Sequence, residues 1–301
     1  MSGKVGLAMM AMALAGCTAP QVASPTPPER ADGKALAKAC ASRDGWSDPA
    51  PPARIHGKTY YVGTCGISAI LIDTAQGLVL IDAATDKAAP LILDNIRALG
   101  FDPKNIRYLL ASHEHLDHVG GLAAILQASG APVYALAAAQ AALTTGEMDR
   151  TDPQHGSFPP FKGVSVRGIM QDGETLPIVG LDLTIHATPA HTPGGTSWTW
   201  RSCEAGACHT IAYVDSLSAV SSDSYRFSDH PDYVAMMRKT IARVPSLPCD
   251  ILITPHPGAS NVHARLAGEA PLVDTTACKT YANAATARLD ARLAKEKAGT
   301  P

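Results

Sequence analysis

The chain has 301 residues, of which 46% are hydrophobic and 17% charged, and its formal net charge is -2. This balance is typical of a globular protein with enough apolar residues for a sizeable core, in one large domain or two small ones. The near-neutral charge, the lack of a basic run and an aromatic content of 5% argue against nucleic acid as a partner.

The first 17 residues predict export. A lysine precedes an apolar run over residues 5–14, and small residues follow, which is typical of an export signal too short to span a bilayer. "LAGC" resembles a lipobox, which would leave Cys17 lipidated and make this anchor the only membrane contact. "ALA" at residues 13–15 fits ordinary signal-peptide cleavage instead. Both alternatives place the protein in the periplasm.

A flexible tether is predicted over residues 18–34, which are rich in proline and small residues. A single domain is expected over residues 35–301. From about residue 58 the chain becomes a series of short apolar runs separated by glycine-containing turns, and these predict adjacent strands. In the first half, strands are expected over residues 59–64, 67–74, 77–83, 106–112 and 132–136, with helices over 87–100 and 121–130.

The second half repeats this pattern of short apolar runs separated by turns. Its apolar runs predict strands over residues 181–188, 196–200, 209–215 and 250–255, with helices over 230–244 and 280–297. Two halves of sheet followed by helix indicate an α/β sandwich of αββα order, in which two mixed sheets pack face to face with helices outside. Residues 145–163 form a long polar, proline-containing loop between the halves, which suggests a functional lid or, alternatively, disorder.

Cysteine usage agrees with export, because six cysteines remain after residue 17 and an even number suggests disulfides in an oxidising compartment. "CEAGAC" resembles a hairpin tip between two predicted strands, which favours a Cys203–Cys208 bond. Some thiols could alternatively be buried and free. The remaining pairs, taken in order, would be Cys40–Cys65 and Cys249–Cys278.

The stretch "SHEHLDHVGG" is the strongest signal of chemistry in the chain. It follows a predicted strand, and in an extended segment alternate side chains point the same way, so His113 and His115 could bind one ion together. Asp117 and His118 follow as the chain turns, before a helix expected to begin near Gly121. Imidazole and carboxylate together suit zinc.

Two further histidines stand just past predicted strands. His191 precedes "TPGG" and His256 precedes "PG", so glycine and proline restrict both loops. The six residues divide into two sets, each leaving coordination positions open for water and substrate, which is typical of catalytic zinc. The sets are His113, His115 and His191, and Asp117, His118 and His256. The other histidines are interpreted as ordinary surface or core residues: His56, His155, His186, His209, His230 and His263.

The motifs "HEHLDH", "PAHTPGG" and "TPHPGAS" resemble those of the metallo-β-lactamase superfamily. "HTPGGTSWTW" and "CDILITPHPGAS" are similar to the di-zinc β-lactamase subclass that uses no cysteine ligand. "YVGTCGISA", "DRTDPQ" and "TWRSCE", with the six cysteines, resemble its Adelaide imipenemase branch. The resemblance implies an αββα fold with two Zn²⁺ per chain between its sheets, held by the six residues above.

The resemblance also implies an activity, hydrolysis of the β-lactam amide bond of penicillins, cephalosporins and carbapenems, which confers antibiotic resistance. In the expected mechanism a zinc-bound hydroxide, oriented by Asp117 as the catalytic residue, attacks without a covalent intermediate. The substrate is a small molecule, and no heptad or large apolar surface helix argues against a monomer. Ser216 and Ser218 would bind the substrate carboxylate, or would simply form a turn.

Other hypotheses remain at this stage. If Asp215, at the end of its strand, bridged both metals, a thioester or lactone hydrolase would be favoured; a non-catalytic zinc-binding export protein is the third alternative. Asp82 is predicted either to orient a ligand imidazole or to cap a turn at its strand end. Gln154, on the long loop, is predicted to flank the cleft and shape substrate preference.

Overall fold

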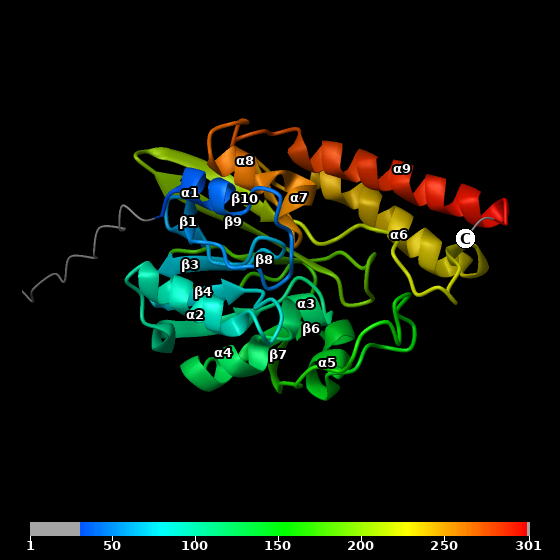
Figure 1. The fold of residues 1–301 in the computed structure, drawn as a ribbon, viewed down its shortest axis with the longest axis horizontal. Helices are drawn as coiled ribbons and strands as arrows, with labels where there is room; N and C mark the ends of the chain where they lie inside the picture. The colour runs from blue at the N-terminus through cyan, green and yellow to red at the C-terminus, as the bar shows by residue number, and fades with distance from the viewer. Residues whose placement is uncertain (1–30, 300–301) are drawn as a thin grey trace, which may run out of the picture.

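The computed structural model of the protein describes residues 31–299. The predicted export signal, with Cys17, and most of the tether therefore lie outside the described residues. Two β-sheets pack face to face and helices cover their outer faces (Figure 1). This arrangement confirms the predicted αββα sandwich. Within the described range, no helix has both the length and the apolarity needed to cross a membrane.

The larger sheet has seven strands in sequential order, antiparallel from β1 to β4 and parallel from β4 to β7. The parallel half makes the carboxyl ends of β4 and β5 meet at one edge, next to the outer helices that connect them. The strands are β1 (Ala53–His56), β2 (Thr59–Tyr61), β3 (Ile70–Thr74), β4 (Gly77–Ile81), β5 (Ile106–Leu110), β6 (Val133–Leu136) and β7 (Val166–Met170).

The smaller sheet has the order β11-β10-β9-β8, with β10 and β11 parallel and the other pairs antiparallel. Its inner face contributes Trp198 and Trp200, both fully buried, to the core between the sheets. The indole nitrogen of Trp198 donates to the Ala111 carbonyl oxygen (2.9 Å), which joins the two sheets near the end of β5. The strands are β8 (Thr184–Ala187), β9 (Thr196–Glu204), β10 (Ala207–Tyr213) and β11 (Ile251–Ile253).

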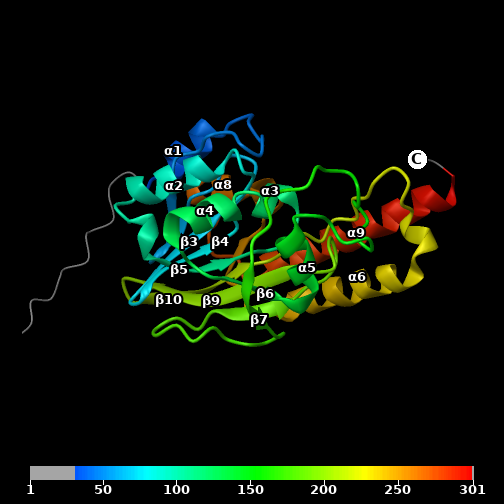
Figure 2. The same ribbon diagram turned by 90° about the horizontal axis from the view of Figure 1, so that it is seen from below.

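The outer helices divide between the two sheets. The larger sheet is covered by α2 (Ala89–Ala98), α4 (Leu122–Ser129) and α5 (Ala137–Thr145). The smaller sheet is covered by α6 (Pro231–Arg243) and α9 (Ala277–Lys297), which lie side by side in Figures 1 and 2. The short elements are α1 (Gly33–Ala39), α3 (Leu116–Val119), α7 (Pro257–Ser260), α8 (Val262–Leu266), and the 3-10 turns η1 (Pro103–Asn105), η2 (Phe227–Asp229) and η3 (Val244–Ser246).

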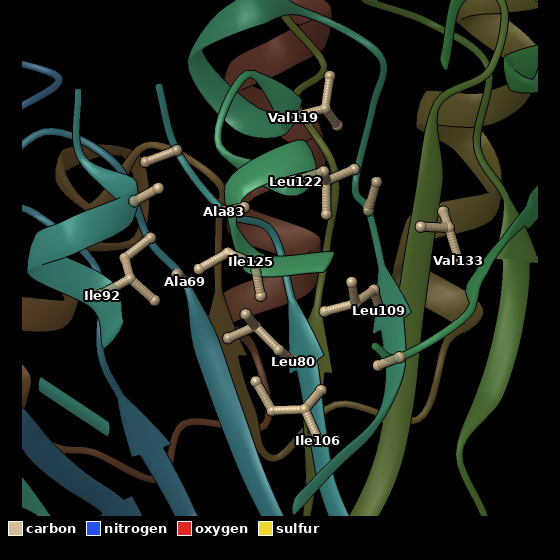
Figure 3. Close-up of a cluster of buried hydrophobic side chains, with 14 of the residues drawn as sticks. Ala69, Leu80, Ala83, Ile92, Ile106, Leu109, Val119, Leu122, Ile125 and Val133 are labelled. Atoms are coloured by element: carbon tan, nitrogen blue, oxygen red, sulfur yellow. The ribbon is translucent and has the colours of Figure 1, made fainter. Parts of the chain in front are cut away.

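Side-chain alternation explains why the strands are apolar on both faces. In β4, Leu80 faces the helices while Ile81 faces the other sheet, and both are fully buried. Figure 3 shows Leu80 and Leu109 of the larger sheet against Ile125 of α4. Because the side-chain period of a strand is two, a slip of one residue would exchange these two cores, so the register is strongly specified. The strand ends, and the residues that follow them, are thereby fixed in position.

Three disulfides join the cysteine pairs that were predicted in order: Cys40–Cys65, Cys203–Cys208 and Cys249–Cys278. The hairpin bond spans 5 residues, whereas the bond from the start of β11 to α9 spans 29. The loop-entropy model relates stabilisation to this span.

Replacing both Cys249 and Cys278 with serine is expected to lower the free energy of unfolding by about 3.6 kcal/mol, because a long loop is released in the unfolded chain. The matched control is the double serine variant of the Cys203–Cys208 hairpin, with an expected loss of about 2 kcal/mol. Urea unfolding of the two variants measures both values. Equal losses, or a larger loss in the hairpin variant, would contradict the loop-length explanation.

Some local predictions differ from the structure. Helix α1 begins at Gly33, inside the segment predicted as a tether, because the Asp32 carboxylate caps it and Gly33 packs directly against Leu266. The last helix begins at Ala277 rather than residue 280. The strands β1 and β7 and the helix α5 were not predicted. Residues 146–163 contain no long element, but Asp152 and Gln154 within them are buried.

Candidate active site

Strands from both sheets end at one edge of the sandwich and bring the candidate ligands together. His113 and His115 follow β5, His191 follows β8 and His256 follows β11. The sequence predicted this placement because each histidine comes directly after an apolar run. The structure adds that all three strands direct their carboxyl ends toward the same site.

The first set consists of His113, His115 and His191. Each offers a ring nitrogen within 4.8 Å of the others, and the ring centroids lie 4.9–5.0 Å apart with nearly perpendicular planes. All three side chains are buried. Nε2 of His113 is buried without a hydrogen-bond partner. Such a nitrogen costs free energy unless something binds it, so this set has the properties of a metal site.

The second set surrounds the carboxylate of Asp117. Its Oδ2 lies 3.1 Å from Nε2 of His118 and 3.4 Å from Nε2 of His256. Asp117 and His118 also form a compact group with His113, within 4.8 Å, so the two sets adjoin each other. His256 is the most accessible member, with 40% of its side chain exposed.

The local backbone corrects one prediction. Asp117 and His118 were expected in a loop before a helix near Gly121, but they lie on the one-turn helix α3. The amides of His118 and Val119 donate to the carbonyl oxygen of His115, at 2.9 and 3.0 Å. A single turn has too few apolar residues for a detectable helical period, so the sequence pattern did not reveal it. The turn directs both side chains back toward the three histidines.

The electrostatics of the site favour the metal-binding forms of His113, His191 and Asp117, whereas the adjacent Asp117 raises the pKa of His118. Burial, reinforced by the neighbouring histidines His118 and His191, holds the pKa of His113 well below its usual range. Burial and the nearby His115 lower the pKa of His191 to about 3. Both rings are therefore neutral at pH 7 and keep a lone pair for a metal. Burial opposes ionisation of Asp117, but the adjacent His118 overcomes this effect and lowers its pKa, so the carboxylate is charged.

Buried carboxylates orient two of the histidines from behind. Nδ1 of His113 lies 2.7 Å from Oδ1 of Asp215, and Nε2 of His115 lies 2.9 Å from Oδ2 of Asp152. A carboxylate accepts a hydrogen bond, so each ring carries its proton on the side away from the site. Such outer partners fix the tautomer and ring orientation of metal-binding histidines. Asp152 was not predicted from the sequence, because its contact with His115 depends on how the long loop folds back.

The other two partners come from predicted residues. Nδ1 of His191 lies 3.0 Å from the Ser218 hydroxyl and 3.1 Å from its carbonyl oxygen, so Ser218 orients a ligand ring in addition to any contact with substrate. Nδ1 of His118 lies 3.3 Å from Oδ2 of Asp82. Asp82 also accepts hydrogen bonds from the Ser112 amide and hydroxyl and from the Tyr213 hydroxyl. The placement of Asp82 therefore supports the predicted orientation of the His118 ring. Its hydrogen bonds to Ser112 also fix the chain just after the end of β5.

Gln154 and Ser216 are both close to this constellation. The side-chain amide of Gln154 lies 3.1 Å from Nε2 of His191, and its backbone amide donates to Oδ1 of Asp152 (2.7 Å). The middle of the long loop thus lies beside His115 and His191. Ser216 is buried directly after Asp215. The six histidines interpreted as ordinary residues are outside both ligand groups of the described chain.

These residues fit zinc. The donors are imidazole nitrogens and one carboxylate, the ligand types that Zn²⁺ takes in proteins. Nε2 of His113 is buried without a hydrogen-bond partner, and the imidazole rings of the first set lie close together. A cation bound between the rings would explain both observations. Hydrogen-bonded outer partners are present for three of the ligand rings, and Asp82 lies 3.3 Å from Nδ1 of His118.

Comparison with known proteins agrees with this geometry. The family model described as the metallo-beta-lactamase superfamily matches residues 62–204. Solved metallo-β-lactamases up to 49% identical are matched over nearly their whole lengths. The chain therefore belongs to the metallo-β-lactamases, the class B family of β-lactamase enzymes.

Within that family the neighbours are subclass B3 enzymes, as the resemblance to the Adelaide imipenemase branch implied. The chain is similar to MIM-1 from Novosphingobium pentaromativorans, with 49% identity over 89% of this chain and 100% of that one and a TM-score of 0.86. For SMB-1 the identity is 45%, over 84% and 99%, with a TM-score of 0.80. For MEM-A1, a subclass B3 enzyme from a soil metagenome library, it is 40%, over 85% and 100%, with a TM-score of 0.81.

Curated relatives match over shorter stretches. YobT of Bacillus subtilis, an uncharacterized protein, is 27% identical over 46% of this chain and 59% of its own length. The N-acyl homoserine lactonase AttM of Agrobacterium fabrum is 35% identical over 21% of this chain and 19% of its own length. The chain thus matches well under two thirds of either relative.

Proposed function

We propose that the protein is a periplasmic β-lactamase that hydrolyses the amide bond of penicillins, cephalosporins and carbapenems with two zinc ions, and so confers resistance to them. One observation carries the proposal: two ligand sets, one of three histidines and one around Asp117, adjoin each other at the open edge of the sandwich. Its similarity to solved metallo-β-lactamases over nearly their whole lengths supports the same activity.

The chain's own residues have defined tasks in this chemistry. Zinc bound in the two sets would polarise the substrate carbonyl and lower the pKa of bound water toward about 7. The charged carboxylate of Asp117, which belongs to the second set, can accept a hydrogen bond from the attacking water and hold it toward the carbonyl carbon. Asp152, Asp215 and Ser218 hold the ligand rings in place, so little reorganisation is needed during the reaction.

The surroundings suit a small substrate. A groove of about 600 Å³ beside the ligand loop is lined by Trp46, Leu116 and Phe161, among others, with Lys87 at its border. Leu116 lies between His115 and Asp117 in sequence, whereas none of the six candidate ligands lines the groove. Ser47, Thr85, Asp86 and Lys162 line it as well, so the groove offers both apolar contact and polar groups to a small molecule.

The lactone or thioester alternative depends on Asp215 as a bridging ligand. In the structure, Oδ1 of Asp215 lies 2.7 Å from Nδ1 of His113, on the side of the ring opposite the orphaned Nε2. A carboxylate placed behind a ligand orients that ligand and is not between two metals. The geometry therefore favours β-lactam chemistry over this alternative.

The proposed function is tested by carbapenem hydrolysis with the purified mature protein, followed by the absorbance of the ring. We expect turnover that a chelator abolishes and added zinc restores. Absence of turnover from protein that binds two zinc ions would refute the β-lactamase assignment. A parallel assay on an acylated lactone would then test the alternative.

Exchanging Gln154 for alanine is expected to change the relative kcat/KM values on several β-lactams by a few-fold, since its side chain reaches over the cleft beside His191. The control is Gln76→Ala, a glutamine that only accepts from the Val179 amide far from the site. Steady-state kinetics on a penicillin, a cephalosporin and a carbapenem measures the ratios. A uniform change on all three substrates would remove Gln154 from the specificity assignment.

Export and quaternary state remain part of the proposal. The three disulfides are of the kind that persist in oxidising compartments such as the periplasm. Mass spectrometry of the mature N-terminus distinguishes a lipidated Cys17 from ordinary cleavage near residue 15. We expect a monomer in solution, which light scattering of the mature protein measures directly.

A further inference from the structure

The residue between the first two ligands has a distinct environment. Glu114 lies between His113 and His115, and its carboxylate is bound by the loop that carries His191 rather than belonging to either metal set. It is 1% exposed and is outside both ligand groups of the described residues. A buried carboxylate is costly unless it is paired or hydrogen-bonded, so its partners define its role.

Both hydrogen-bond donors to Glu114 come from the loop that carries His191. The Thr192 hydroxyl donates to Oε2 at 2.9 Å, and the Gly194 amide donates to Oε1 at 2.8 Å. The contact is also close sterically: a Cβ on Gly194 would lie 2.6 Å from Oε2 of Glu114 and 2.7 Å from the Cβ of Ala139 in α5. Glycine is therefore required here to let the His191 loop approach the carboxylate.

This contact joins the two loops that supply the three histidines. Two of its histidines come from the loop after β5 in the larger sheet, and the third comes from the loop after β8 in the smaller sheet. Another tie between these loops is the hydrogen bond from the Thr196 amide to the Ser112 carbonyl oxygen (2.7 Å). Zinc accepts nitrogen ligands only near about 2.0–2.1 Å, so the spacing of the two loops must be held closely.

We propose that Glu114 is a positioning residue that sets the spacing between the two ligand loops and so determines the zinc affinity of the three-histidine set. The same short segment thus serves both purposes, with His113 and His115 facing the metal and Glu114 binding the opposite loop. The proposal rests on zinc as the resident metal of the proposed function, but not on the identity of the substrate.

The test is the zinc affinity of purified variants, measured by competition with a chromophoric chelator, together with unfolding in urea. Glu114→Ala is expected to lower the zinc affinity of the three-histidine set by at least about tenfold, the effect typical of outer contacts at metal sites. Glu114→Gln should recover much of the loss, because its carbonyl oxygen can accept from the Gly194 amide while its amide group donates to the Thr192 hydroxyl.

A matched control is available in the chain. Glu296 is also a buried carboxylate that holds a loop, since it accepts from the amides of Phe227 (3.1 Å) and Ser228 (2.7 Å), but that turn carries no ligand. Glu296→Ala should therefore lower stability without changing zinc affinity. If Glu114→Ala behaves in the same way, the proposal is overturned and Glu114 has only a structural role.

A second variant covers the case in which Glu114→Ala does not fold. Thr192→Val removes one donor and keeps the shape of the side chain. Reduced zinc affinity in folded Thr192→Val protein supports the proposal, and unchanged affinity overturns it. Because the measured quantity is metal binding, the result is independent of β-lactam turnover and remains interpretable if the proposed substrate class is wrong.

Discussion

Asp117→Ala is expected to leave a folded protein that loses turnover by about 10²–10⁴-fold, the range associated with a positioned acid-base group. Asp117 is also expected to contribute a ligand to the second set, where its Oδ2 lies 3.1 Å from His118 and 3.4 Å from His256. The variant should therefore lose much of its second zinc as well. Elemental analysis and carbapenem kinetics on the same preparation measure both effects.

The control for this variant is Asp94→Ala, which removes an exposed aspartate of α2 that pairs only with Arg97. Surface pairs of this kind contribute little to stability, so metal content and kcat should be unchanged. If Asp117→Ala retained both full activity and two bound zinc ions, the assignment of the catalytic residue would be wrong.

Asp215→Ala is expected to weaken zinc binding at the three-histidine set by about 10–100-fold, because it removes the partner that orients His113. The Nδ1–H of His113, which is fully buried, would also lose its acceptor, at a cost of about 1–3 kcal/mol in the free energy of unfolding. Chelator competition and urea unfolding measure the two quantities. Asp215→Asn, which keeps an acceptor oxygen in the same place, should recover part of both losses.

This variant also distinguishes two roles for Asp215. A residue that orients His113 affects mainly the three-histidine set, whereas a bridging ligand would affect both sets equally. Equal loss of both zinc ions from Asp215→Ala would therefore contradict the orienting role and favour the lactone or thioester alternative. The stoichiometry of bound zinc during stepwise titration of the variant separates these outcomes.

The sequence predicted those parts of the fold that local patterns determine. Strands such as β3, β4 and β10 are dense apolar runs between turn residues, and the candidate ligands stand directly after such runs. Helix α5 was missed because "AAAQAALTT" is mostly alanine and has only a weak apolar face. Helix α3 was missed because a single turn has no measurable period.

The outer parts of the site were less predictable, for a physical reason. Asp152 and Glu114 act through partners 37 and 78–80 residues away in the chain, and nothing in their local sequence marks them as buried. A lone aspartate in a polar loop is normally exposed. Asp215 was noticed from its place at a strand end, but whether it bridged two metals or oriented one ligand depended on the three-dimensional direction of its carboxylate.

The pair of glycines after His191 has an evolutionary consequence. A Cβ on Gly195 would lie 2.6 Å from Oδ2 of Asp215, just as one on Gly194 would approach Glu114. If the protein confers resistance as proposed, inherited variation at these two positions should therefore be almost absent, while exposed positions of the loop over residues 146–163, such as Thr151 and His155, remain open to change. A library of all single substitutions, grown on different β-lactams, should show intolerance at the glycine pair and drug-dependent tolerance in that loop.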